Sequence, residues 1–259
     1  MTNNPTNENQ PNNDLAQTNE FELLTPEEIA QKSNSQVHVF GDGVVCDTEP
    51  RYIEPRGPEI VLDATNGFIP LWEKNTTLRW RFQQRSFLAF RNPEAAKASI
   101  RRLFDRAFSA WGDAAPIKFE ENSQLWDFEI LVRRNDECDR NGCVLASAFF
   151  PNPFQNNQLV IYPQMLARTE QTQVNTLIHE IGHIFGLRHF FAKISETDAP
   201  SVVFGVDREV SIMNYGPKSQ LTDDDKADLK RLYELVWSGQ LTKINQIPIR
   251  SIKAFHTTF

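Results

Sequence analysis

The segment HEIGHIFGLRH, residues 179–189, constrains the fold of this chain more than any other feature of its sequence. Its histidines, His179, His183 and His189, are four and six residues apart, and Gly186 lies between the last two. Histidines at positions i and i+4 lie on one helix face, where both rings can reach one ion about 2.0–2.1 Å away. A third ligand requires the chain to turn, and glycine accepts the left-handed conformation that ends helices. The segment therefore predicts a helix, a turn at Gly186 and a metal ion bound by three imidazoles.

The same residues predict a hydrolytic reaction. Three histidines leave one position of a tetrahedral zinc ion open, which is typical of catalytic zinc rather than structural zinc. Glu180 follows the first histidine, and a carboxylate beside a zinc-bound water can accept its proton while the metal polarises a substrate carbonyl. This chemistry hydrolyses amide bonds. The alternative is a helix whose histidines are merely exposed, and the complete HExxHxxGxxH pattern in helical register argues against it.

The helix that carries the motif is predicted to begin near Thr169 or Thr172 and to run to about Phe185. At 100° per residue its apolar side chains fall within one sector, whereas His179 and His183 lie nearly opposite. The two imidazoles are therefore expected to face away from the core. The apolar sector consists of Val174, Leu177, Ile178, Ile181 and Phe185.

The other predicted elements are two helices and a set of short strands. Asn92 is a candidate N-cap, with Pro93 just inside a long amphipathic helix. Thr222 and Asp225 resemble a capping box at the start of a third helix. One long helix among short strands predicts a mixed sheet with a helix packed on it. The strands are expected at 77–83, 117–121, 128–134, 144–150 and 158–162.

Composition excludes two kinds of partner. The 259 residues carry a formal net charge of -7, and the lysines and arginines are scattered. A phosphate-binding face needs clustered positive charge, so no nucleic-acid partner is expected. No run of eighteen or more apolar residues occurs, so no membrane span is expected either.

The N-terminal part of the chain differs from the rest. Residues 1–20 are rich in Asn, Thr, Gln and Pro and nearly free of apolar side chains, which predicts a disordered polar tail. Residues 21–76 are predicted to form an irregular N-terminal segment and a candidate pro-segment, with a short helix within 21–36 capped by Thr25. No ordinary secretory signal precedes it in the chain as given.

Three cysteines are too few for a disulfide scaffold. Cys138 and Cys143 flank the turn-like residues DRNG. Two free thiols are expected there, and the alternative is a disulfide that closes a small loop in an oxidising compartment.

Two motifs together resemble a known clan. HEIGHIFGLRH is followed by SIMNYG, in which Met213 stands where the metzincin zinc endopeptidases have their methionine turn. The resemblance is closest to the matrixins, peptidase family M10, and covers roughly residues 77–237. Five segments follow one another in the order found in matrixins: TLRWRFQ, AFSAWGDAAPIKFEE, DFEILVRR, NGCVLASAFFP and LTDDDKADLKRLYEL. The resemblance implies that Met213 packs beneath the metal and is not a ligand.

The resemblance implies an α+β metzincin fold. This is a twisted mixed β-sheet with a backing helix and an active-site helix, plus a small C-terminal subdomain ending in a helix. The catalytic domain is expected at 77–240, with an upper subdomain at 77–189, a lower subdomain at 190–240 and a C-terminal extension at 241–259.

The implied function is that of a zinc-dependent metalloendopeptidase that hydrolyses peptide bonds of protein or peptide substrates. The substrate is expected to lie extended along an edge strand. Zinc is bound by His179, His183 and His189, and Glu180 is the general base and then the acid. The protein is expected to be a monomer. The alternative is a catalytically silent metzincin-fold binding or effector protein.

One departure from the matrixins concerns further ions. Matrixins hold a second, structural zinc with histidines in two strands, but Ser147 and Tyr162 occupy those positions here. No second zinc of that type is expected. Calcium is a further cofactor that Asp139 or Asn141 could bind, and a plain polar turn is the favoured alternative.

A second departure concerns Tyr215. Matrixins usually carry proline near this position, whereas SIMNYG is similar to the methionine turn of astacins and serralysins. In those families the tyrosine can ligate the resting metal and later donate to the oxyanion, which makes Tyr215 a candidate catalytic residue. The alternative is a packed tyrosine that never reaches the metal. Phe190 replaces the glutamate that astacins carry after the third histidine.

Latency and location complete the expectations. Cys46 and Asp47 lie upstream of the catalytic domain, and either type of residue blocks the zinc in related pro-enzymes. The PRCGxPD pattern is not matched, so a buried or incidental thiol is the favoured interpretation of Cys46. The resemblance implies secretion to the extracellular space, and a cytoplasmic peptidase is the alternative because no signal peptide is seen.

Overall fold

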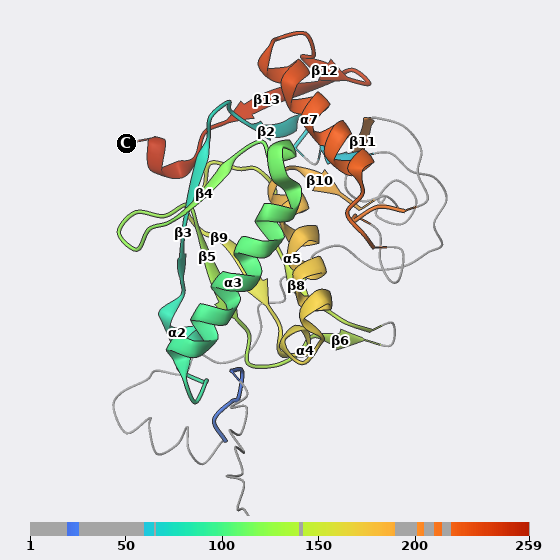
Figure 1. Cartoon of the computed structure of the whole chain (residues 1–259). Coiled ribbons are helices and arrows are strands. Elements are labelled where there is room, and N and C mark those ends of the chain that lie inside the picture. Colours follow the sequence, from blue (N-terminus) through green and yellow to red (C-terminus); the bar gives the residue numbers. More distant parts are fainter. Residues whose placement is uncertain are drawn as a thin grey trace, which may run out of the picture.

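In the computed structural model, two long helices lie side by side against one face of a five-stranded sheet (Figure 1). The structure describes residues 20–25, 60–64, 66–139, 142–189, 201–204, 210–213 and 219–258. Outside the described residues lie Cys46, Asp47, Asn141, Tyr215, the side chain of Asp139 and positions 26–36 of the predicted short helix.

The five-stranded sheet has four parallel strands and one antiparallel edge strand. Burial alternates along its second strand, where Leu78, Trp80 and Phe82 point into the core as predicted. This alternation arises because successive side chains of a strand face opposite sides of the sheet. The strand order is β4 (Lys118–Glu121), β3 (Thr77–Phe82), β5 (Phe128–Val132), β9 (Asn157–Ile161) and β8 (Ala146–Ser147).

The edge strand β8 is shorter than the strand predicted at 144–150. Only Ala146 and Ser147 pair with β9. The chain then leaves the sheet, and Phe149 packs against Phe128 with ring centroids 5.3 Å apart. This ring is partly buried against the core, where the sequence had predicted further strand pairing.

Helices α3 (Pro93–Trp111) and α5 (Glu170–Ile184) begin where the sequence predicts them. Asn92 and Thr169 cap them by accepting a backbone N–H three residues further on, at 3.1 and 3.3 Å. Trp111, at the end of α3, donates from Nε1 to a backbone carbonyl of α5 at 3.3 Å. Within the described part of the chain, no helix combines the length and apolar character needed to cross a membrane.

A hairpin of β6 (Cys138–Asp139) and β7 (Gly142–Cys143) lies near the sheet edge. Cys138 and Cys143 are directly opposite in its ladder and form a disulfide. The expectation of two free thiols is therefore wrong, because the spacing alone did not show that the chain folds back between the cysteines. A small apolar cluster on the other face of the sheet consists of Leu131, Val160, Tyr162 and Val144.

A three-stranded sheet lies beside the end of α5. β1 (Ile60–Asp63) is its central strand and pairs antiparallel with β10 (Leu187–Arg188) and β11 (Ser201–Phe204). A further strand, β2 (Ile69–Trp72), follows β1 and is fully buried. The segment 21–76, expected to be irregular, thus contributes two strands.

The C-terminal residues return to the body of the molecule. β13 (Ile247–Ile252) pairs in parallel with β2 and antiparallel with β12 (Lys243–Ile244). The turn η3 (Phe255–Thr257) then places His256 on Asp127, whose carboxylate accepts the His256 N–H at 2.9 Å and faces Nδ1 at 2.8 Å. Asp127 is 2% exposed and also accepts a backbone N–H of β3 at 2.6 Å. The remaining short helices are α2 (Gln84–Phe87), η1 (Gly112–Ala114) and α4 (Pro163–Leu166).

Helix α7 (Asp223–Trp237) holds the end of α5 in place. It begins with the predicted capping box. Its Tyr233 hydroxyl donates to the carbonyl of Phe185 at 2.9 Å, and Trp72 donates from Nε1 to the carbonyl of Ile184 at 2.7 Å. The last carbonyls of a helix lack partners within it, so these two bonds fix the point at which α5 ends.

Candidate metal centre

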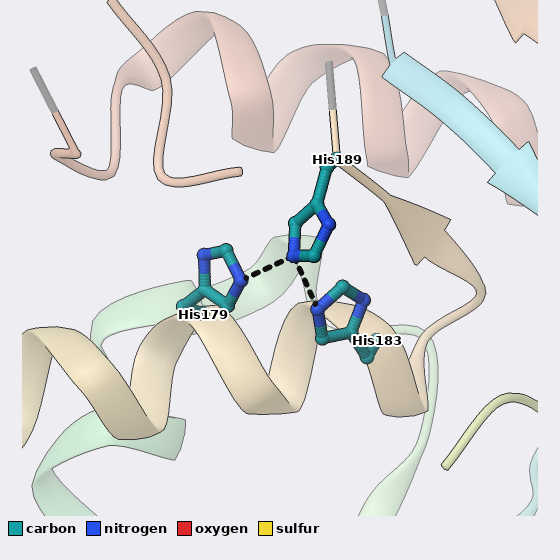
Figure 2. A group of neighbouring side chains, drawn as sticks. All are labelled: His179, His183 and His189. Atoms are coloured by element: carbon teal, nitrogen blue, oxygen red, sulfur yellow. Dashed lines mark hydrogen bonds between the residues drawn. The ribbon is translucent and has the colours of Figure 1, made fainter. Parts of the chain in front are cut away.

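Three histidine side chains converge on one point beside α5. His179 and His183 come from the helix and His189 from the residue after β10 (Figure 2). The Nε2 atom of His189 lies 3.1 Å from that of His179 and 3.2 Å from that of His183. Ligands at about 2.05 Å from a tetrahedral zinc ion are about 3.4 Å apart. The Nε2 atom of His189 therefore has nearly the spacing from each of the other two that ligands of one ion have, and all three ligand atoms lie within 4.8 Å of one another.

The outer nitrogens of the two helical histidines fix which ring nitrogen carries the proton. The Nδ1 of His179 lies 2.7 Å from the carbonyl of Ile212, and that of His183 lies 2.7 Å from the carbonyl of Leu187. A carbonyl only accepts, so each Nδ1 carries the proton and each Nε2 presents a lone pair to the centre. Burial, and then the proximity of His189 and His179, lower the pKa of His183 well below its ordinary value. His183 is thus neutral, as a metal ligand must be.

The turn at Gly186 brings the third histidine back to the helix. Gly186 has a φ of 95°, a backbone conformation that residues other than glycine rarely adopt. Its N–H donates to the carbonyl of His183 at 2.8 Å. An added Cβ would also lie 3.1 Å from Leu71 and 3.3 Å from the carbonyl of Pro70. Glycine is required here for both backbone conformation and space.

Met213 packs directly against the helix that carries the two histidines. A Cβ on Gly182 would lie 2.6 Å from the Sδ of Met213 and 3.6 Å from the Trp111 ring. Met213 is 2% exposed. Met213 is thus packed against α5 at Gly182, the residue before His183, and its role beneath a metal ion stays a prediction.

Asp225 connects α7 to the turn around residues 211–213. Its carboxylate accepts from the Ser211 hydroxyl at 2.6 Å and from the Ile212 N–H at 3.2 Å. It also accepts the N–H and the hydroxyl of Thr222, both at 2.9 Å. Because the Ile212 carbonyl also contacts Nδ1 of His179, hydrogen bonds connect Asp225 to His179 through this turn. The sequence indicated only its capping role, since nothing in the sequence pairs it with Ser211.

Glu180 is a buried carboxylate that can still accept a hydrogen bond. It is 5% exposed, and its Oε2 has no hydrogen-bond partner among the described residues. Burial raises the pKa of Glu180 to about 8. A cation nearby would favour the ionised form instead.

This donor set fits a zinc ion. Three neutral imidazole nitrogens are ligands that zinc prefers, and a catalytic site keeps one position for water or substrate. Among the described residues, His179, His183 and His189 form the group whose ligand atoms all lie within 4.8 Å of one another. The imidazoles lie opposite the apolar sector of α5, as predicted, but they are 7–8% exposed because β10 and the turn at 211–213 cover them.

Comparison with known families agrees with this geometry. The family model described as Matrixin matches residues 71–234, well over half of the chain. The chain belongs to the matrixin family. The mixed α+β architecture and the five-stranded sheet are those expected from this membership, so the predicted family and fold are both confirmed.

Curated proteins similar to this matrixin include three metalloproteinases. It is 29% identical to macrophage metalloelastase of Rattus norvegicus over 125 residues, 43% of this chain and 26% of that protein. It is 28% identical to Metalloendoproteinase 4-MMP of Arabidopsis thaliana over 142 residues, 48% of this chain and 40% of that protein. It is 27% identical to Matrix metalloproteinase-2 of Drosophila melanogaster over 178 residues, 63% of this chain and 21% of that protein. The matched parts thus span less than half of each relative.

The matrixin has other contacts at the positions discussed for a second zinc. The Tyr162 hydroxyl donates to Glu137 at 2.9 Å, and Ser147 is buried opposite Val160 in β8 and β9. The hairpin next to them is closed by the Cys138–Cys143 disulfide. Covalent closure therefore stabilises this part of the matrixin.

Proposed function

We propose that this matrixin is a zinc-dependent endopeptidase. The observation that carries the proposal is the convergence of three Nε2 atoms, two of them with their outer nitrogens bonded to backbone carbonyls. His179, His183 and His189 would hold the ion, which when bound supplies Lewis acidity for a substrate carbonyl and a water of lowered pKa.

Glu180 is proposed as the proton carrier. In its ionised form it accepts a proton from the attacking water and then delivers it to the nitrogen of the departing amine. Its burial supports this role, because a proton held in a water-poor site is passed to the substrate rather than lost to solvent. Tyr215 remains the proposed donor to the oxyanion.

An extended peptide is the proposed substrate. β8 lies at the edge of the sheet, where an added strand can pair with its free backbone groups. The chain leads from β8 to Phe150, whose ring centroid lies 5.4 Å from that of His183. A peptide along this edge would thus pass the metal centre. The relatives' names describe proteinases, which supports protein substrates here.

We also propose an extracellular location. Disulfides persist in oxidising compartments and are rare in the cytosol. The Cys138–Cys143 disulfide therefore favours secretion over the cytoplasmic alternative.

The test compares wild type with Glu180→Gln. Both proteins are loaded with zinc, the bound metal is quantified, and cleavage of an unfolded protein is followed with and without chelator. We expect one zinc per chain in both, cleavage by the wild type only, and loss of that cleavage on chelation. A Glu180→Gln variant that cleaves as fast as wild type would overturn the proposed mechanism. A wild type that binds zinc but cleaves nothing would favour the binding-protein alternative.

A further inference from the structure

Arg188 is a buried cation next to a metal ligand. It lies between Leu187 and His189, and its side chain is 0% exposed. Moving a guanidinium out of water is costly unless a negative charge compensates it. Two groups described nearby interact with the guanidinium, and of these Asp63 carries the negative charge. The Asp63 carboxylate lies 3.9 Å from Nη1, and the Phe150 ring lies 5.9 Å from the guanidinium carbon.

Asp63 is brought there by strand pairing. In the register of β1 and β10, Leu62 lies opposite Leu187. The N–H of Asp63 donates to the carbonyl of Gly186 at 3.3 Å. Asp63 is 5% exposed and Leu62 is 0% exposed. β1 therefore runs along the whole turn that returns the chain to the metal centre.

This turn sets the orientation of His183 and the position of His189, two of the three proposed ligands. Leu187 provides the carbonyl that accepts the Nδ1 proton of His183. His189 follows Arg188 directly, so a shift of β10 would move His189 together with the carbonyl that orients His183. β1 precedes residues 71–234, the part matched by the family model. The support for these ligands thus comes from outside the family-matched part of the chain.

We propose that Asp63 is a positioning residue of the metal centre. Its carboxylate compensates the buried charge of Arg188, and this pair together with the β1–β10 ladder fixes Leu187 and His189. His183 and His189 then present their Nε2 atoms to one point without rearrangement. The inference deepens the proposed function, on which it rests, because it concerns the same zinc site.

The experiment measures the zinc affinity of the full chain by competition with a chromophoric chelator. Asp63→Asn is compared with Asp127→Asn, a matched control in which another buried carboxylate is neutralised away from the site, where it contacts His256. Outer-shell substitutions typically weaken metal binding about 10–100-fold. Asp63 contacts Arg188 rather than a ligand, so we expect a loss near the lower end of that range, about 10-fold, for Asp63→Asn, and wild-type zinc affinity for Asp127→Asn.

A second pair of variants covers the case in which Asp63→Asn does not fold. Asp63→Glu keeps the charge but displaces it, and Asp127→Glu is its control. We expect zinc affinity to fall for Asp63→Glu, by less than for Asp63→Asn, and to stay unchanged for Asp127→Glu. The visible spectrum of the cobalt-substituted proteins reports ligand geometry and is expected to change only in the Asp63 variants.

The outcomes separate this inference from the proposed function. Folded Asp63 variants with the zinc affinity and cobalt spectrum of wild type would overturn the positioning role and leave the endopeptidase proposal standing. A wild type that binds zinc but cleaves no protein, together with weaker zinc binding by Asp63→Asn, would overturn the activity and leave the positioning role standing.

Discussion

The sheet-and-helix body and the surroundings of the metal centre are held by different interactions. In the body, aromatic rings fill the space between α3 and the sheet, and Phe104 lies 5.5 Å from Trp80 and 5.2 Å from Phe119 between ring centroids. Around the metal centre, directed hydrogen bonds from Asp225 and from two backbone carbonyls dominate. Apolar burial is non-directional, whereas a hydrogen bond fixes orientation. The body should therefore determine stability, and the surroundings should determine metal affinity.

The largest expected effect is a loss of stability caused by a substitution in the sheet-and-helix body alone. Phe104 is 1% exposed, and Phe104→Ala should lower the free energy of unfolding by about 3–5 kcal/mol because it leaves a cavity. Chemical denaturation measures this loss. Zinc affinity of the folded fraction should remain that of wild type, and a parallel fall in both quantities would contradict the division between the two regions.

Asp225→Ala should affect both quantities. It removes the acceptor of the Ser211 hydroxyl and the Ile212 N–H, and leaving buried polar groups unpaired costs about 1–3 kcal/mol. Since Ile212 orients His179, zinc affinity should also fall about 10–100-fold. Chelator competition and denaturation curves on the same protein measure the two effects. A loss of stability with unchanged zinc affinity would show that Asp225 is only a helix cap.

Gly182→Ala tests the contact between the two regions. Alanine normally favours a helix over glycine by about 0.5–1 kcal/mol, but here its Cβ would lie 2.6 Å from the Met213 sulfur. Overpacking of this kind costs about 1–3 kcal/mol, so net destabilisation is expected. Met213→Ala alone leaves a cavity and should also destabilise the protein, but in that background Gly182→Ala should cost less than it does in wild type, because the sulfur it would contact is absent. A thermal melt in which Gly182→Ala is stabilised would show that the methionine moves away freely.

Tyr233→Phe should have the smallest effect. It removes the hydroxyl that donates to the Phe185 carbonyl, worth about 0.5–1.5 kcal/mol. Burial raises the pKa of Tyr233, so this residue is protonated in both folded and unfolded protein below about pH 10. The difference in unfolding free energy between wild type and variant should then be constant from neutral pH up to that limit. A difference that varies within this range would point to another titrating group.

Local patterns predicted the elements but not their long-range partners. The caps Asn92 and Thr169 and the alternation in β3 depend on neighbouring residues, and each is found where expected. The motif at 179–189 likewise specified three converging histidines, because helix geometry and one glycine suffice to bring them together.

Contacts between distant segments could not be obtained in this way. The pairing of β1 with β10 depends on backbone groups that every residue has, so the sequence carries no sign of it. The same is true of Asp63 beside Arg188 and of Asp225 beside Ser211, since one carboxylate among many is not distinguished until the chain is folded. The disulfide required knowledge that the chain reverses between its cysteines.

The parallel pairing of β13 with β2 determines where the protein can be shortened. A version ending at residue 234, where the family match stops, would lose β13 and leave the backbone groups of β2 without their ladder. A strand with unpaired backbone groups can form hydrogen bonds with other chains, so this shortened protein should aggregate. It would also lose the imidazole that Asp127 contacts. Recombinant work on this protein should therefore retain the tail through His256.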